Sequence, residues 1–155
     1  NGGTIDLIVE QPADPITMAT IIGDKVLNGD QIRELMKGIN EIGGQILSLT
    51  LDSKSTILYV ANGENLADIL HKIVIHNKLG KAVSFYEDLR MIIIKGSSLE
   101  TIPGLIQRVT QPLARKDINV FGLITISSSI RIFVSKNQVD KTVPLLKTAL
   151  LSIKQ

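Results

Sequence analysis

The residues able to carry out chemistry are few in this chain, and their spacing does not assemble a catalytic or metal site. There is no cysteine among the 155 residues, which excludes disulfides and thiolate metal sites. The two histidines, His71 and His76, have no third ligand to complete a zinc site, so solvated or capping roles are favoured. No serine lies in a Gly-x-Ser-x-Gly motif, and no paired carboxylates share a predicted helix face. The sequence therefore predicts no catalytic residue, metal or cofactor.

The strongest candidate for binding a small molecule is a short segment between an apolar strand and a predicted helix. A helix start presents free N–H groups and the positive end of the helix dipole, which suit a ligand carboxylate. Gly104 would permit close approach, and Glu100 could meet a ligand ammonium. The alternative is a plain capped turn in which Pro103 only sets the backbone angle. The candidate residues are Ser98, Leu99, Glu100, Thr101, Ile102, Pro103 and Gly104.

A second candidate pair, Asn119 and Val120, opens the strand that follows this helix. The Asn119 side-chain amide could read a carboxylate or carbonyl. We expect this strand start to be a neighbour of the same loop. Asparagine is also common in turns before strands, so the residue alone is weak evidence.

Composition limits the partners. Hydrophobic residues make up 44% of the chain and aromatic residues only 3%, which disfavours stacking on bases or sugars. The net charge of +2 comes from scattered residues and gives no basic patch, so nucleic acid is not expected as a partner. No apolar run approaches a membrane span, and no signal-peptide pattern is present. A soluble, cytoplasmic protein is the resulting expectation.

The elements that must position the candidate residues occur twice, because the chain is an internal repeat. Met18 to Gly23 aligns with Met91 to Gly96, 73 positions later. After one inserted residue, Leu58 to Val60 aligns with Ile132 to Val134. The hydrophobic order is retained although identity is low. The strands at 17–22, 45–51 and 56–61 thus correspond to those at 91–95, 119–126 and 130–135, with helices near 66–76 and 138–153 closing the two copies.

Each copy has the order β-α-β-β-α, one strand short of the βαββαβ ferredoxin-like unit. Residues 81–86 supply the missing strand of the first unit. Nothing follows the last helix, so residues 4–10 are the run able to complete the second sheet, whose edge would otherwise be bare. The predicted fold class is α+β, with tandem ferredoxin-like units and interlocked antiparallel sheets. The predicted units are 11–86, and 87–155 completed by the strand 4–10.

The repeat places a second candidate loop in the first unit. Its candidate residues are Asp24, Asn28, Gly29 and Asp30. Asp24 or Asp30 could hold an ammonium, but the favoured role of Asp30 is to cap the helix that follows. In the second unit, Pro103 is predicted at the first helical position, and Pro112 is predicted to kink or break the helix. Residues 127–129 are three serines that could donate hydroxyls, although a polar turn is the favoured interpretation.

The segments beginning at Met91, Ile102, Ile118 and Ser127 resemble the ACT domain, and most closely the tandem ACT regulatory region of aspartate kinases. The resemblance covers about residues 90–150 directly and residues 4–86 only through the repeat. It implies a non-catalytic module that binds an aspartate-family amino acid, such as lysine or threonine, at a subunit interface. It also implies a homodimer, feedback control of a biosynthetic enzyme, and kinase activity confined to a domain outside this chain.

The chain departs from that family pattern at three places. Ser129 stands where the aspartate-kinase pattern usually has glutamate, and the first unit has Asn28-Gly29-Asp30 in place of Pro-Gly and Gln45-Ile46 in place of Asn-Val. These departures leave the effector open. They also allow two alternatives, a structural dimerisation module without a ligand and a regulatory subunit of another enzyme such as acetolactate synthase. An RNA-binding module of the same fold would need aromatic residues on its strands.

Overall fold

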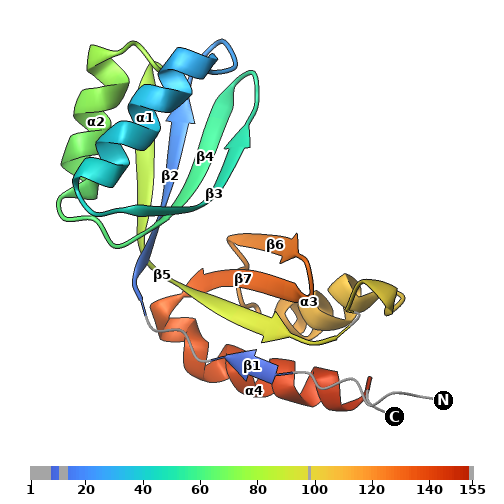
Figure 1. Ribbon diagram of the computed structural model, residues 1–155. Coiled ribbons are helices and arrows are strands. Elements are labelled where there is room, and N and C mark those ends of the chain that lie inside the picture. Colours follow the sequence, from blue (N-terminus) through green and yellow to red (C-terminus); the bar gives the residue numbers. More distant parts are fainter. Residues whose placement is uncertain (1–7, 11–13, 98, 154–155) are drawn as a thin grey trace. The chain divides into compact units, whose positions relative to one another are not determined.

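The computed structural model describes residues 8–10, 14–97 and 99–153. They form two compact units, one of residues 14–89 and one in which residues 8–10 join the chain from Arg90 onward. Figure 1 labels the elements of both units. Each unit is built in the order βαββαβ or its equivalent, with antiparallel strand pairs, which confirms the predicted α+β class.

The first unit begins with β2 (Ile16–Ile22), α1 (Gly29–Glu41) and β3 (Gln45–Leu51). It continues with β4 (Ser55–Ala61), α2 (Leu66–His76) and the first part of β5 (Ala82–Lys95). The strand order is β3-β4-β2-β5, and both helices cover one face (Figure 1). Residues at alternate strand positions pack against the helices because a strand turns successive side chains to opposite faces. The core members include Ala19, Ile21, Leu35, Ile39, Leu58, Val60, Leu70 and Val74.

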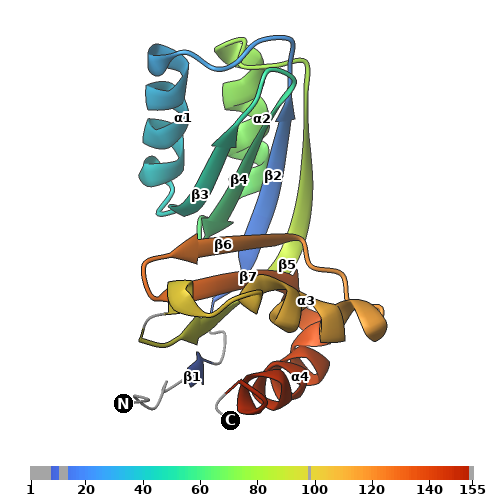
Figure 2. The same cartoon turned by 90° about the vertical axis from the view of Figure 1, so that its right-hand side faces the viewer.

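The second unit contains the rest of β5, the 3₁₀ turn η1 (Leu99–Thr101) and α3 (Leu105–Arg115). The hairpin β6 (Gly122–Ile126) and β7 (Ser129–Ser135) follows, and then the turn η2 (Lys136–Gln138) and α4 (Val139–Leu151). The strand order is β1-β5-β7-β6. α3 and α4 share one core against the sheet (Figure 2), with members that include Ile92, Ile94, Val109, Leu113, Ile130, Ile132, Val134, Val143 and Leu146.

The strand β1 (Ile8–Glu10) occupies the edge of the second unit's sheet. It pairs antiparallel with β5, with Ile8 opposite Lys95 and Glu10 opposite Ile93, and the Lys95 ammonium lies 2.8 Å from the Glu10 carboxylate. Of the strand predicted at residues 4–10, positions 4–7 lie outside the described residues. The described part shows that the N-terminal segment adds a strand to the sheet of the unit at the other end of the sequence.

β5 departs from the prediction of two separate strands at 81–86 and 91–95, since it is one strand of 14 residues. Its pairing with β2 puts Met18 opposite Tyr86 but Ile16 opposite Leu89, so β5 carries one extra residue in this stretch. Asp88 has a φ of 59° there, in the left-handed region that aspartate tolerates. The strand therefore continues through a bulge instead of ending in a turn.

The start of α1 corrects a second prediction, because Asn28 and not Asp30 caps this helix. The Asn28 side chain accepts from the backbone N–H of Gln31, and the Gln31 side chain accepts from the backbone N–H of Asn28, both at 2.9 Å. This is a reciprocal capping box. Asp30 is the second residue of the helix, within its first turn, and its exposed carboxylate is 3.2 Å from the Arg33 guanidinium.

The start of α3 differs from the sequence-based expectation. Pro103 lies before the helix and not at its first position, because Gly104 (φ 65°) is the N-cap and Leu105 is the first helical residue. Pro112 is inside the helix and does not break it, since the helix continues to Arg115. After the helix, Asp117 adopts a φ of 56°, and Ile118 donates to the Leu113 carbonyl at 2.9 Å. The chain reversal at Asp117 thus closes α3 in the manner of a Schellman motif.

The strand predicted at 119–126 is shorter in the structure. β6 starts at Gly122, and Asn119 and Val120 precede it without forming part of the strand. The Phe121 N–H donates to the Phe133 carbonyl at 2.9 Å, so pairing with β7 begins only at this point. Ile118, buried at 4% exposure, anchors the segment that crosses from α3 to the sheet.

Candidate functional site

The second unit contains a hollow of about 330 Å³ at the carboxyl end of β5. Its walls are the loop that leads into α3 on one side and the β6–β7 hairpin on the other. A volume of this size lies at the small end of the range for ligand pockets, about 300–1,000 Å³. The lining residues are Leu99, Glu100, Ile102, Gly104, Leu105, Ile106, Thr125, Ser127, Ser129 and Ile130.

Two sets of contacts hold the walls of the hollow together. The N–H of Gly96, directly after β5, donates to the carbonyl of Ser128 at the tip of the hairpin, at 3.1 Å. On the loop side, Leu99 is buried at 4% exposure, and the Ile102 N–H closes the 3₁₀ turn on its carbonyl at 3.2 Å. The loop is therefore anchored in the core at Leu99 while Glu100 remains exposed beside the hollow.

The start of α3 at this hollow has no side-chain cap among the described residues. Gly104 reaches a left-handed conformation (φ 65°, ψ 23°), and a Cβ added there would meet no atom within 4 Å. The first turn of a helix leaves N–H groups without intrahelical partners. With no acidic residue in that turn and open space beside Gly104, the helix start can accept an anionic group from outside the chain.

Among the described lining residues, the polar side chains are one carboxylate and three hydroxyls. Glu100 is the one charged residue among the described lining residues. Thr125 and Ser127 are exposed, while the Ser129 hydroxyl donates to the Ile126 carbonyl at 2.8 Å and keeps its lone pairs as acceptors. Leu105 and Ile130, exposed at 6% and 2%, supply apolar surface. An acidic group, hydroxyls and a helix start can together hold a small zwitterion.

The structure does not bring Asn119 and Val120 to this hollow, so the expected proximity of Asn119 to the loop is wrong. Gly104 caps the amino end of α3. Asn119 lies just beyond the carboxyl end of that helix, because the preceding residue, Ile118, donates its N–H to the Leu113 carbonyl. The 11 residues of α3 span about 16 Å at 1.5 Å per residue. The sequence pattern placed the strand start beside the loop, but the helix between them carries the chain to the opposite end of the unit.

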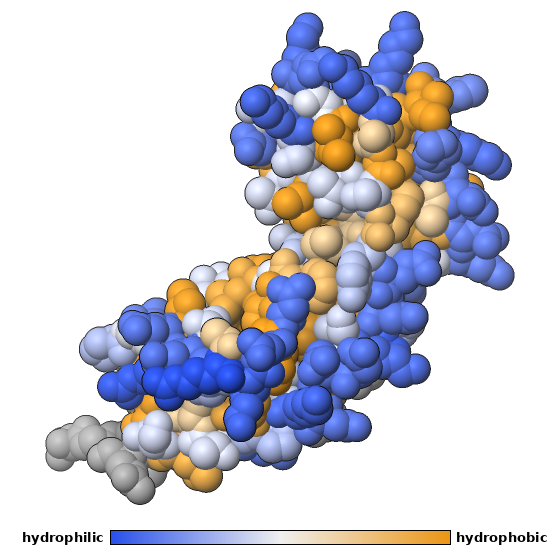
Figure 3. Space-filling view, turned by 180° about the vertical axis from the view of Figure 1, so that it is seen from behind, coloured by the Kyte–Doolittle hydropathy of each residue, from blue (hydrophilic) through white to orange (hydrophobic). Residues whose placement is uncertain are grey.

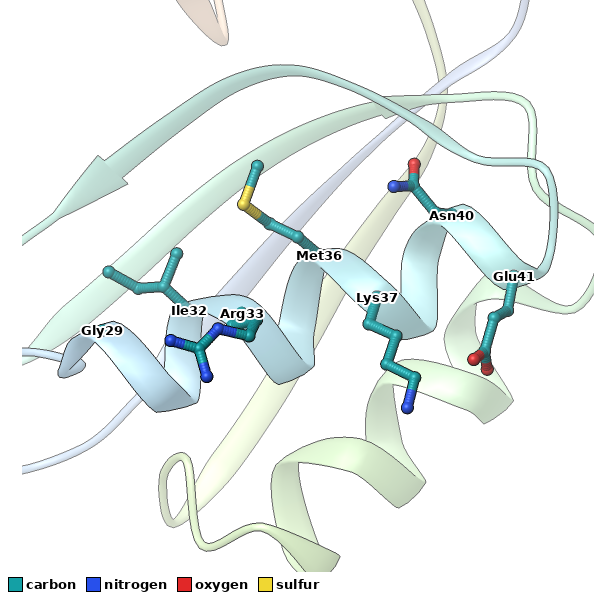
Figure 4. Close-up of a pocket in the computed structure, with 7 residues that line it drawn as sticks. All are labelled: Gly29, Ile32, Arg33, Met36, Lys37, Asn40 and Glu41. Atoms are coloured by element: carbon teal, nitrogen blue, oxygen red, sulfur yellow. The ribbon is translucent and has the colours of Figure 1, made fainter.

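The candidate residues of the first unit's loop are engaged in contacts within that unit. Asn28 is in the capping box, Asp30 lies beside Arg33, and the Asp24 carboxylate is 2.8 Å from the Lys81 ammonium. Gly29 lines a shallow hollow whose other residues also belong to α1, and their side chains fan out from the helix instead of converging (Figure 4). The polar side chains of the first loop therefore stabilise the first unit and do not converge on a ligand site.

The described residues contain no group of three or more histidine, cysteine, aspartate or glutamate side chains placed to hold a metal ion. None of the helices in the described ranges is long and apolar enough to cross a membrane.

Comparison with known proteins identifies the second unit. A family model for the ACT domain matches residues 84–148. This segment is similar to ACT domains. The match includes the strand, the candidate loop and the hairpin that form the hollow, and it confirms the resemblance seen in the sequence. Among curated proteins, none matches the chain.

Solved structures with a similar fold include regulatory regions of aspartate kinases. The aspartate kinase of Clostridium acetobutylicum superposes with a TM-score of 0.81 at 13% identity, over 96% of this chain and 35% of that one. The regulatory subunit of aspartate kinase from Thermus thermophilus gives 0.72 at 13% identity, over 95% and 99%. Aspartokinase III of E. coli, in complex with lysine and aspartate, gives 0.64 at 14% identity, over 92% and 32%. At these identities the likeness establishes the fold, and the chain spans about a third of the Clostridium enzyme.

The hairpin side of the hollow is only partly indicated by the sequence. Thr125 is not among the sequence candidates, and for the serines at 127–129 the sequence favours a polar turn over hydroxyl donors to a ligand. The order of the strands could have located them. β6 and β7 form an antiparallel hairpin, and the connection from β5 through α3 to β6 puts the tip of this hairpin at the end of β5, where the loop begins. The topology of the repeat, followed strand by strand, therefore identifies the second wall of the hollow.

Proposed function

We propose that this chain is a non-catalytic regulatory module whose second unit binds a free amino acid and thereby controls an amino-acid biosynthetic enzyme such as aspartate kinase. The observation that supports the proposal is the hollow between the Leu99–Gly104 loop and the β6–β7 hairpin, at an uncapped helix start. The ligand carboxylate would rest beside Gly104, and its ammonium would pair with Glu100. The E. coli relative was solved with lysine and aspartate, which is consistent with an amino-acid effector.

Control would operate by linkage. An effector that binds one arrangement of the module better than another shifts the populations of both, and an attached or partner enzyme responds to the shift. Couplings of this type amount to about 1–3 kcal/mol. The amino acid would therefore act by changing the equilibrium between forms of the regulated enzyme, and any kinase chemistry would belong to a domain outside this sequence.

The proposal includes a homodimer, because large apolar side chains remain exposed on the sheets and their edges. Ile8 is 58% exposed, Ile22 46%, Tyr86 42% and Ile126 42%. Figure 3 shows hydrophobic residues reaching the surface among hydrophilic ones on the face that it presents. Light scattering at micromolar concentration tests this part, and a monomer would contradict it.

The test of ligand binding compares two variants at one position, Gly104→Asp and Gly104→Asn. Both residues tolerate the left-handed conformation, and Asn65 already adopts it (φ 56°, ψ 37°) at the N-cap of α2. The two variants therefore carry similar backbone strain, and their new Cβ enters open space. Only aspartate adds a negative charge where the ligand carboxylate should sit.

Thermal unfolding with threonine, methionine and lysine gives the readout. A ligand at a hundredfold excess over its Kd stabilises the folded state by about 2.7 kcal/mol, which raises the melting temperature by several degrees. We expect at least one of the three amino acids to produce the shift in the wild type and in Gly104→Asn, and we expect the shift to be lost in Gly104→Asp. If no amino acid moves the melting temperature of the wild type at millimolar concentration, the sensor function is refuted and a purely structural dimerisation module takes its place.

A further inference from the structure

We propose that the hollow of the second unit accepts an amino acid with an uncharged side chain, aliphatic or hydroxylated, and discriminates against lysine. This inference rests on the proposed function and narrows the class of effector. It follows from the charges and the surface that the described lining residues offer, not from the identity of any relative's ligand.

The argument begins with charge. Glu100 is the one carboxylate among the described lining residues, and no arginine, lysine or histidine is among them. Every amino acid uses one negative partner for its α-ammonium group. Lysine carries a second ammonium, and the described lining residues offer it no second carboxylate. An ammonium that loses part of its hydration without gaining a carboxylate partner is unfavourable, so lysine should bind about tenfold more weakly than an uncharged analogue.

The same charges disfavour an acidic side chain. An aspartate ligand would bring a side-chain carboxylate in addition to its α-carboxylate. Glu100 is the charged residue among the described lining residues, and two negative charges that are close together repel. The α3 start can neutralise one carboxylate beside Gly104, and the ligand's own α-carboxylate already uses that position.

The remaining lining fits an uncharged side chain. Leu99, Leu105 and Ile130 are nearly fully buried and present apolar surface to the hollow. Thr125 and Ser127 are exposed at the hairpin, where a hydroxyl on the ligand could donate to or accept from them. Side chains such as those of threonine, valine, isoleucine and methionine match this combination of apolar floor and hydroxyl rim.

The experiment measures Kd by calorimetry on the whole chain for threonine, valine, methionine, lysine and aspartate. We expect measurable affinity for at least one of the first three and a Kd for lysine and aspartate at least about tenfold higher. Glu100→Gln should weaken every ligand, since all of them share the α-ammonium.

A gain of function provides the sharper test. Thr125→Glu adds a second carboxylate at an exposed position of the edge strand β6, where the fold tolerates a charge. It should improve lysine relative to threonine by about tenfold, because the second ammonium gains a partner. Thr50→Glu is the matched control, since Thr50 is an exposed threonine on β3, the edge strand of the first unit, and does not line the hollow. This control should leave the ratio unchanged.

The outcomes separate the two proposals. Lysine binding to the wild type as tightly as threonine, valine or methionine overturns the inference on selectivity while the proposed function stands. Binding of uncharged amino acids that is unaffected by Glu100→Gln, with no gain for lysine in Thr125→Glu, overturns it as well, because the ligand then lies elsewhere. Failure of all five amino acids to bind at millimolar concentration overturns the proposed function and the inference with it.

Discussion

Gly80 is the glycine of the first unit whose replacement we expect to be most costly. It lies between α2 and β5, directly before Lys81, whose N–H donates to the Ile22 carbonyl at 2.7 Å. A Cβ added to Gly80 would lie 2.5 Å from that carbonyl oxygen and 2.8 Å from the Cγ2 of Ile21, which is 1% exposed. Both distances are far below normal contact, and neither obstacle is the end of a flexible side chain. The end of β2 must therefore move away from β5 to accept alanine.

The magnitude follows from these two contacts. Overpacking a close-packed interior costs about 1–3 kcal/mol, and weakening the Lys81–Ile22 hydrogen bond adds about 0.5–1.5 kcal/mol. Gly80→Ala should therefore lower the free energy of unfolding by about 2–4 kcal/mol. Gly29→Ala is the control, because a Cβ there meets nothing within 4 Å and the position opens a helix. It should change stability by less than about 0.5 kcal/mol.

Urea unfolding followed by circular dichroism measures both variants. The far-ultraviolet signal reports loss of the helices and strands without requiring tryptophan, which this chain lacks. A Gly80→Ala midpoint equal to that of Gly29→Ala would refute the steric argument, since it would mean that the β2–β5 end relaxes without losing packing or the hydrogen bond.

Two further changes test other parts of the structure. Deleting residues 1–10 should lower the free energy of unfolding of the second unit by about 2–3 kcal/mol and expose the edge of β5, because β1 and its partly buried Val9 are lost. An unchanged melting temperature and solubility would contradict the strand assignment. Burial raises the pKa of Tyr59 above its ordinary value, so the folded state holds this proton more tightly than the unfolded chain. That contribution to stability is complete below about pH 10 and is lost as the pH rises through the folded-state pKa. Tyr59→Phe should flatten the alkaline loss of stability in pH-dependent urea titrations, and an equally steep loss in this variant would contradict the assignment to Tyr59.

The sequence was most informative where hydrophobic periodicity decides the structure. Ile130, Ile132 and Val134 alternate along one strand, and all three are buried in the core of the second unit. The repeat supplied the order of elements in each unit, because core positions are kept when other residues change. The need for an additional strand in the second sheet followed from counting strands, and Ile8–Glu10 pairs there.

Local competition between similar residues was not predictable in the same way. Asn28 and Asp30 are both good N-caps, and only the pairing of Asn28 with Gln31 decides between them. Asp88 permits a bulge as readily as a turn, and the ladder to β2 selects the bulge. The position of Asn119 depends on the length of α3 and not on any property of asparagine. These choices depend on partners that are distant in the sequence, which propensities do not include.

The pairing of Ile16 with Leu89 has a consequence for the order in which the protein folds. The first unit is continuous in sequence, and this pair holds its beginning and its end side by side. Before the first unit folds, pairing of β1 with Ile93–Lys95 on β5 closes a long loop of flexible chain. Once the first unit has folded, the flexible part of that loop is roughly a tenth as long, which lowers the entropic cost of closing it by about 2 kcal/mol. We therefore expect the first unit to fold early, during synthesis, and to hold β1 close to its partner strand β5. The second unit can be completed only after α4 has emerged from the ribosome.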